Sequence, residues 1–237
     1  MNITESLQFF AKQTATFEEG FAYARKNGNY HLLSLNARQV FLNRLMQALM
    51  TWRMKENPRA LIEEVVDRGL ESMSALFELK PEANVASAFP IEKLRMVAFL
   101  IDREVETKKE WQLIESPDRN LDYLLGTILT GHPLTSLSNA IAVEVGKLFA
   151  TNRSALAAKS YQLYFDILSV DGVKGEVDGL VDEADNLYRQ RVVDAFYSNG
   201  YEVEGGGLDN ELIVDYRMGA VLKYLNYSDS SAHVWRW

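Results

Sequence analysis

Apolar positions recur at steps of three and four along most of the chain, which is the spacing of an amphipathic helix. Residues 34–55 and 59–79 each carry one such apolar stripe. Pro58 precedes the second segment and Pro81 follows it, where proline fits the start and the end of a helix. The same spacing predicts further helices at 4–26, after Pro90, and at 118–130, 134–150, 154–169, 176–198 and 209–226.

No segment shows the sustained alternation of a half-buried strand. The pattern therefore predicts an all-α fold of about nine helices in antiparallel hairpins, as a compact bundle or as loosely stacked helical hairpins. We find no strict repeat of about 34 or 40 residues, so a regular helical array is not supported. We expect a single domain over residues 1–237, with 1–116 and 117–237 as possible lobes.

Composition excludes several kinds of site. Of the 237 residues, 47% are hydrophobic, which suffices to bury a core without a disulfide or metal. There is no cysteine for a disulfide, a thiolate-bound metal or a cysteine nucleophile. The three histidines have no metal-binding spacing, and no serine lies in a nucleophile elbow. We therefore expect no catalytic residue, no cofactor and no metal.

The N-terminal stretch "MNITESLQFFAKQ" lacks the basic and apolar regions of a secretory signal. No apolar run approaches the ~18 residues of a membrane-spanning helix. We accordingly expect a cytoplasmic protein. The net charge of −8 argues against nucleic acid or an anionic membrane as the partner, because both attract Lys and Arg.

The acidity is concentrated in one region. Residues 166–215 hold thirteen acidic and three basic side chains, a net charge of −10, whereas the rest of the chain carries +2. Acids in a first helical turn stabilise the helix dipole, which explains some of them. The remaining excess costs self-repulsion and favours a role in attracting a basic protein partner.

Three consecutive glycines, Gly205–Gly207, lie inside this acidic region, between Glu202 and Glu204 on one side and Asp209 and Glu211 on the other. A phosphate-binding loop would need a lysine and a preceding strand, and neither is present. The glycines instead predict a break between two helices. We expect Asp209 to cap the second helix, with Glu211 in its first turn.

Aromatic residues accompany the acids in the last third of the chain. Trp235 and Trp237 in "HVWRW" share one face if the segment is extended, either packed on the core or exposed as a contact surface. Tyrosines 197, 201, 216, 224 and 227 lie in the same third and suit a protein interface. The candidate partner-binding residues are Asp171, Glu176, Asp178, Asp182, Glu202, Glu204, Asp209, Glu211, Tyr201, Trp235 and Trp237.

A small, acidic, cysteine-free, helical chain with the stretch "FYSNGYEVEGGGLDNELIVDYRMGAVLKY" resembles bacterial immunity proteins of polymorphic-toxin systems. The resemblance is one of general character. It implies a non-catalytic protein that blocks a basic, nuclease-like toxin, its acids mimicking phosphates. Two alternatives stay open: an all-α hydrolase that holds a metal with carboxylates near 166–185, and a scaffold of helical hairpins that binds a peptide.

Overall fold

The structure is a computed structural model that describes residues 3–54, 57–81, 89–103, 106, 121–150, 155–170, 174–198 and 214–227. Within these ranges it contains nine α-helices and no strand, which confirms the all-α prediction. The chain divides into two compact units, Met1–Pro117 and Asp118–Trp237. That residues 1–237 act as one domain stays a prediction.

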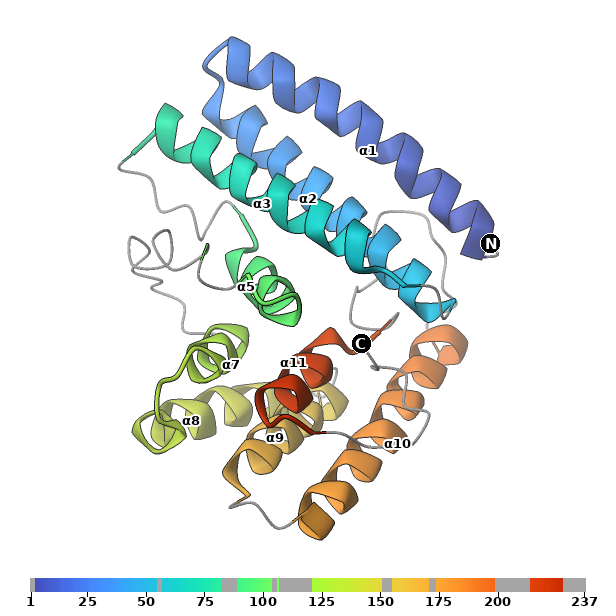
Figure 1. The fold of residues 1–237 in the computed structure, drawn as a ribbon, viewed down its shortest axis with the longest axis vertical. Helices are drawn as coiled ribbons and strands as arrows, with labels where there is room; N and C mark the ends of the chain where they lie inside the picture. Colours follow the sequence, from blue (N-terminus) through green and yellow to red (C-terminus); the bar gives the residue numbers. More distant parts are fainter. Residues whose placement is uncertain are drawn as a thin grey trace. The chain divides into compact units, whose positions relative to one another are not determined.

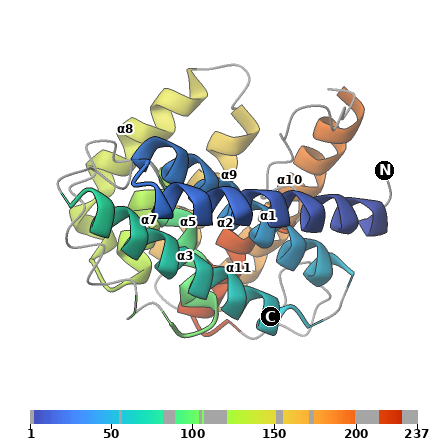
Figure 2. The ribbon, with the colours of Figure 1, turned by 90° about the horizontal axis from the view of Figure 1, so that it is seen from above.

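Unit 1 is built on three long helices, α1 (Ile3–Lys26), α2 (Tyr30–Arg53) and α3 (Arg59–Leu79). Figure 1 shows α1 and α2 as a hairpin with α3 along α2, and Figure 2 shows the same three helices from above. The short helix α5 (Ile91–Leu100) packs against α3. The apolar stripes of α2, α3 and α5 form the core, with fully buried residues that include Leu33, Phe41, Leu45, Leu49, Ile62, Val66, Met73, Leu76 and Leu94.

The turn from α1 to α2 explains why α2 begins earlier than its apolar stripe predicts. Gly28 has a φ of +64°, a conformation that glycine adopts without steric cost. The side chain of Asn29 then accepts a hydrogen bond of 3.1 Å from the backbone N–H of Leu32. This cap starts α2 at Tyr30, four residues before the predicted 34.

Gly69 lets α3 and α5 approach closely. A Cβ atom at this position would lie 2.6 Å from Cδ1 of Leu94, a fully buried residue on α5. Any larger residue would therefore displace a packed side chain. Gly69 thus permits a close contact with Leu94 that the apolar periodicity of α3 does not predict.

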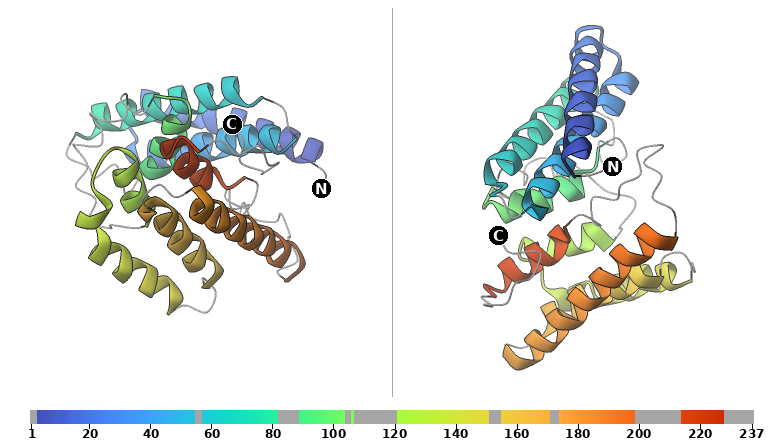
Figure 3. Two further views of the ribbon diagram at one scale, coloured as in Figure 1. Left: turned by 60° about the horizontal axis from the view of Figure 1, so that its bottom comes forward. Right: turned by 90° about the vertical axis from the view of Figure 1, so that its right-hand side faces the viewer.

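Unit 2 contains α7 (Leu121–Leu129), α8 (Ser138–Phe149), α9 (Ala155–Ser169), α10 (Lys174–Ser198) and α11 (Tyr216–Tyr224). In Figure 3, α8 and α9 are yellow to ochre, α10 is orange and α11 is red. α9 packs against α8, α10 and α11, so it is central to the unit. A separate 3₁₀ turn, Leu134–Ser136, precedes α8, and the helix predicted over 134–150 is thus shorter.

The last predicted helix, 209–226, begins later than expected. Val214 and Asp215 are not helical, and α11 starts at Tyr216. Asp215, rather than Asp209, is the residue that caps it, accepting a 3.2 Å hydrogen bond from the backbone N–H of Met218. Both aspartates suit a helix start, and bonds from other helices, described below, hold Asp215 in place.

Candidate functional site

Helix α10 presents several carboxylates to solvent. Glu176, Asp182 and Glu183 are exposed, and none of them has a hydrogen bond or ion pair with the part of the chain that the structure describes. A step of seven residues places Glu176 and Glu183 on the same face of α10, whereas Asp182, six residues after Glu176, lies about 120° around the helix from it, on the side of Asp178. With respect to the described residues, these three carboxylates are therefore available to a positively charged partner.

Other acids of the same region are bonded inside unit 2. Among the acids of residues 166–215, Asp178 is half-buried, while Asp185 and Asp215 are buried. The acid and donor pairs are Asp166 with Gln162 at 2.7 Å, Asp178 with Tyr227 at 2.6 Å, Asp185 with Arg189 at 2.9 Å and Asp215 with Tyr164 at 2.5 Å. Part of the acidity thus stabilises the unit and is not available to a partner.

The bond between Asp178 and Tyr227 brings two segments of the surface together. The Tyr227 hydroxyl donates to Oδ1 of Asp178 near the start of α10. Tyr224, the last residue of α11 and three residues before Tyr227, is 39% exposed. Asp182, four residues after Asp178, lies on the same side of α10 as this bond. We call the exposed carboxylates Glu176, Asp182 and Glu183 of α10, together with Tyr224 and Tyr227, the acidic–tyrosine surface.

Behind this surface, Asp215 connects α11 to α9. Its Oδ2 accepts from the Tyr164 hydroxyl and its Oδ1 accepts from Met218, so both oxygens are used. Burial raises the pKa of the Asp215 carboxyl, while Arg191, Tyr164 and Arg217 act in the opposite direction. Burial, together with the adjacent Asp215, also raises the pKa of Tyr164 well above its usual value.

A second buried bond connects α11 to α7. Arg217 donates two hydrogen bonds of 2.6 Å, from Nε and Nη2, to the two oxygens of Asp122. The Tyr161 hydroxyl donates to the same carboxylate, and its ring centroid lies 5.3 Å from the Arg217 guanidinium carbon. This bidentate pair fixes the orientation of α11, and with it that of Tyr224 at the far end of the helix.

The sequence did not indicate this network. Asp122 and Arg217 are 95 residues apart, and Tyr164 and Asp215 are 51 apart. No local spacing connects such positions. The only available signal was that Asp215 is a cap-forming residue just before an apolar stripe.

Most of the predicted partner-binding residues lie outside the described part of the chain. Of the eleven, the structure places Glu176, Asp178 and Asp182, all on α10. Glu176 and Asp182 are exposed as expected, whereas Asp178 is bonded to Tyr227. The residues outside the described ranges are Asp171, Tyr201, Glu202, Glu204, Asp209, Glu211, Trp235 and Trp237, together with the glycine triplet.

The described residues offer no site for a metal ion, because no three His, Asp or Glu side chains among them converge. None of the helices in these ranges is long and apolar enough to cross a membrane. No protein-family model, curated protein or solved structure matches the chain. The interpretation of the acidic–tyrosine surface therefore depends on its own geometry.

Proposed function

We propose that this protein is a non-catalytic inhibitor that binds a basic protein, in the manner of an immunity protein that blocks a cognate toxin. The acidic–tyrosine surface of unit 2 would contact the toxin, acting in the cytoplasm. The toxin's basic, nucleic-acid-binding face is the expected target. Glu202, Glu204, Asp209 and Glu211 are proposed to extend the same surface.

One observation carries the proposal: α10 exposes three carboxylates that form no bond with the described residues, and the same helix binds Tyr227 through Asp178. Among the side chains of α10 described from 176 to 191, the exposed cation is Arg189, and it is paired with Asp185. The exposed side chains described in this stretch thus carry a net negative charge. Such a field accelerates encounter with a basic surface, while tyrosines provide apolar contact area.

The two alternatives gain less from the described residues. A metal-dependent hydrolase would need converging carboxylates, and those of the described part of α10 lie bonded or singly exposed. A peptide-binding scaffold would need an extended groove. The pocket found in unit 1 has a volume of about 430 Å³, which suits a small group better than an extended chain.

The experiment is a binding assay against the C-terminal domain of the protein encoded immediately upstream of this gene, where the proposal places the toxin. We expect a stable complex, protection of growth on co-expression, and an association rate that falls steeply with salt. Replacing the three carboxylates by lysine (Glu176→Lys, Asp182→Lys, Glu183→Lys) should weaken binding by more than about tenfold, because complementary charges are replaced by repulsive ones.

The matched control makes the same charge change in unit 1, with Glu5→Lys, Glu19→Lys and Glu63→Lys. It should leave the affinity within about twofold, since these residues lie on other helices and outside the proposed contact surface. Circular dichroism should show both variants folded. Equal weakening by the two triple variants, or no complex with the upstream domain, would contradict the proposal.

A further inference from the structure

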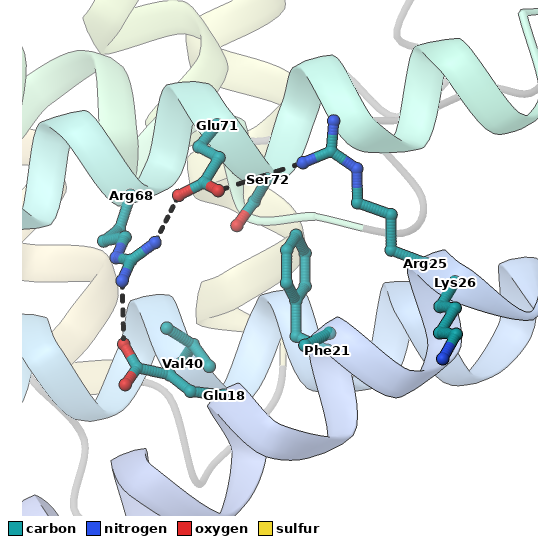
Figure 4. Close-up of a pocket in the computed structure, with 9 residues that line it drawn as sticks. Glu18, Phe21, Arg25, Lys26, Val40, Arg68, Glu71 and Ser72 are labelled. Atoms are coloured by element: carbon teal, nitrogen blue, oxygen red, sulfur yellow. Dashed lines mark hydrogen bonds and ion pairs between the residues drawn. The ribbon is translucent and has the colours of Figure 1, made fainter.

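Unit 1 contains a pocket that the sequence did not predict and that has no part in the proposed function. It has a volume of about 430 Å³ and lies between α1 and α3, with Val40 of α2 among its lining residues (Figure 4). Known small-molecule sites span ~300–1,000 Å³, so this one is at the small end of the range. Its size suits a ligand of one ring or one short side chain.

One part of the pocket is apolar. Phe21 is half-buried and its ring stands in the middle of the pocket between α1 and α3 (Figure 4). Ala22 of α1 and the buried Val40 of α2 add apolar surface. An aromatic or aliphatic group of the ligand would find its contacts here.

The rest of the lining is charged and mostly organised by ion pairs. Glu71 on α3 contacts two arginines, Arg68 on its own helix and Arg25 on α1, whose Nη1 lies 3.9 Å from Oε1 (Figure 4). Glu18 on α1 contacts Arg68 from the other side at 3.6 Å. Both guanidinium groups are thus held at the pocket in defined positions.

Lys26 gives the pocket lining an excess of positive charge. It is exposed, lines the pocket and forms no ion pair or hydrogen bond with the described residues. Three basic and two acidic side chains line the pocket, so its net charge is +1 in a chain of −8. Arg25 donates from Nη2 to Glu78 at 2.8 Å, but its Nη1 contact with Glu71 is long at 3.9 Å, so Nη1 retains donor capacity for an incoming anion.

We infer that this pocket binds a small carboxylate that carries an aromatic or branched apolar group. Lys26 and Arg25 bind the carboxylate, and Phe21 and Val40 contact the apolar group. Such a carboxylate occurs in free organic acids and at the C-terminal residue of a peptide. The inference is independent of the proposed function, because all its residues lie in unit 1.

The test is an NMR titration of the labelled full chain with benzoate, as a free acid, and with N-acetyl-glycyl-phenylalanine, as a peptide C-terminus. We expect benzoate to shift the amide signals of α1 and α3 residues around the pocket, with a dissociation constant on the order of 1 mM. Benzamide, which lacks the charge, and benzylamine, which reverses it, should bind more weakly. Tighter binding of the peptide than of benzoate would identify the peptide C-terminus as the source, and the reverse order would identify the free acid.

Two pairs of variants separate the pocket from general effects. Lys26→Glu should weaken benzoate binding by roughly fivefold, the range of a partly exposed charge contact, whereas Lys12→Glu, also exposed on α1, should not. Ala22→Phe should block the pocket, whereas Ala15→Phe on the same helix should not. The inference is overturned if no signals around the pocket shift, if benzylamine binds as well as benzoate, or if variant and control lose affinity equally.

Discussion

The two units use the same ion-pair chemistry at different depths. In unit 1, Arg25, Arg44 and Arg68 form a ladder of ion pairs with glutamates across α1, α2 and α3, and most of these side chains are 30–60% exposed. In unit 2, the side chains of Arg217 and Asp122 are 3% and 13% exposed. Similar contacts therefore have different consequences. Water screens the ladder, whereas the buried pair is desolvated and its partners depend on each other.

The different depth of the ion pairs also gives charged side chains different roles in the two units. The ladder lies around a pocket and outside the core of unit 1, which is mostly apolar and also buries Arg95 of α5. The buried bonds of unit 2 orient α11, while three carboxylates of α10 are exposed and form no bond with the residues that the structure describes. Charge that is internally paired stabilises the fold, and charge that is left unpaired is available for binding.

The largest expected effect comes from breaking the buried pair. Arg217→Met should lower the free energy of unfolding of unit 2 by about 3–5 kcal/mol, because Asp122 keeps a desolvated charge without its bidentate partner. Hydrogen exchange across α7, α9 and α11 measures the loss. The double variant Asp122→Leu/Arg217→Met should recover most of it. A loss below about 1 kcal/mol in the single variant would mean that the buried pair of unit 2 contributes no more to stability than the surface ion pairs of unit 1.

A smaller loss is expected at the neighbouring tyrosine. Tyr164→Phe should cost about 1–3 kcal/mol, because the buried Asp215 loses a hydrogen-bond donor. Tyr161→Phe on the same helix is the matched control. It should cost less, since Asp122 keeps both bonds from Arg217. Urea unfolding of the two variants compares them, and an equal or larger cost for Tyr161→Phe would contradict the assigned roles.

The buried aspartate should also make stability depend on pH. Burial raises the folded-state pKa of Asp215, so the folded state binds this proton more tightly than the unfolded state does. Its contribution is fully present below the unfolded pKa of about 3.9 and is lost as the pH rises through the folded pKa. The stability of Asp215→Asn relative to the wild type should therefore rise as the pH increases from about 4.

The measurement is a set of urea midpoints for the wild type, Asp215→Asn and Asp182→Asn. Asp182 is exposed on α10, so the stability of its variant relative to the wild type should show no comparable rise. A flat difference for Asp215→Asn would mean that its carboxyl stays ionised in both states.

The smallest effect is expected in the ladder of unit 1. Glu71→Gln removes ion pairs with Arg25 and Arg68 but should cost less than about 1 kcal/mol, because these side chains are 42–46% exposed. The cost should vanish at high salt, where surface pairs are screened. Thermal unfolding at low and high salt measures it. A salt-independent cost as large as that of Arg217→Met would remove the contrast between the units.

Much of the fold follows from local pattern. The stripes of α2, α3 and α9 predicted their helices to within a few residues, because burial on one face imposes the spacing directly. Helix starts were less accurate. Asn29 adds a first turn to α2 that its apolar stripe does not mark, and Asp215 rather than Asp209 begins α11.

The candidate site was predictable only in its composition. The acids of α10 were found by counting charge, and Glu176 and Asp182 are exposed as expected. That Asp178 bonds Tyr227 could not be foreseen, since the two are 49 residues apart and meet only when α11 packs. Sequence shows where charges are concentrated, whereas tertiary packing decides which of them remain free.

The long separation of these bonds has a consequence for synthesis. Arg217, Asp215 and Tyr227 lie at or beside α11 and bond residues 95, 51 and 49 positions earlier in the chain. The ladder of unit 1 also spans up to 53 residues, from Arg25 to Glu78, but all of its residues belong to the first three helices of the chain. Unit 1 can thus fold while the ribosome is still translating. Unit 2 cannot complete its fold until α11 has been synthesised. Until then, polar groups that are buried in the folded unit lack their partners in the nascent chain. During this period a chaperone or a protease has its best access to the chain.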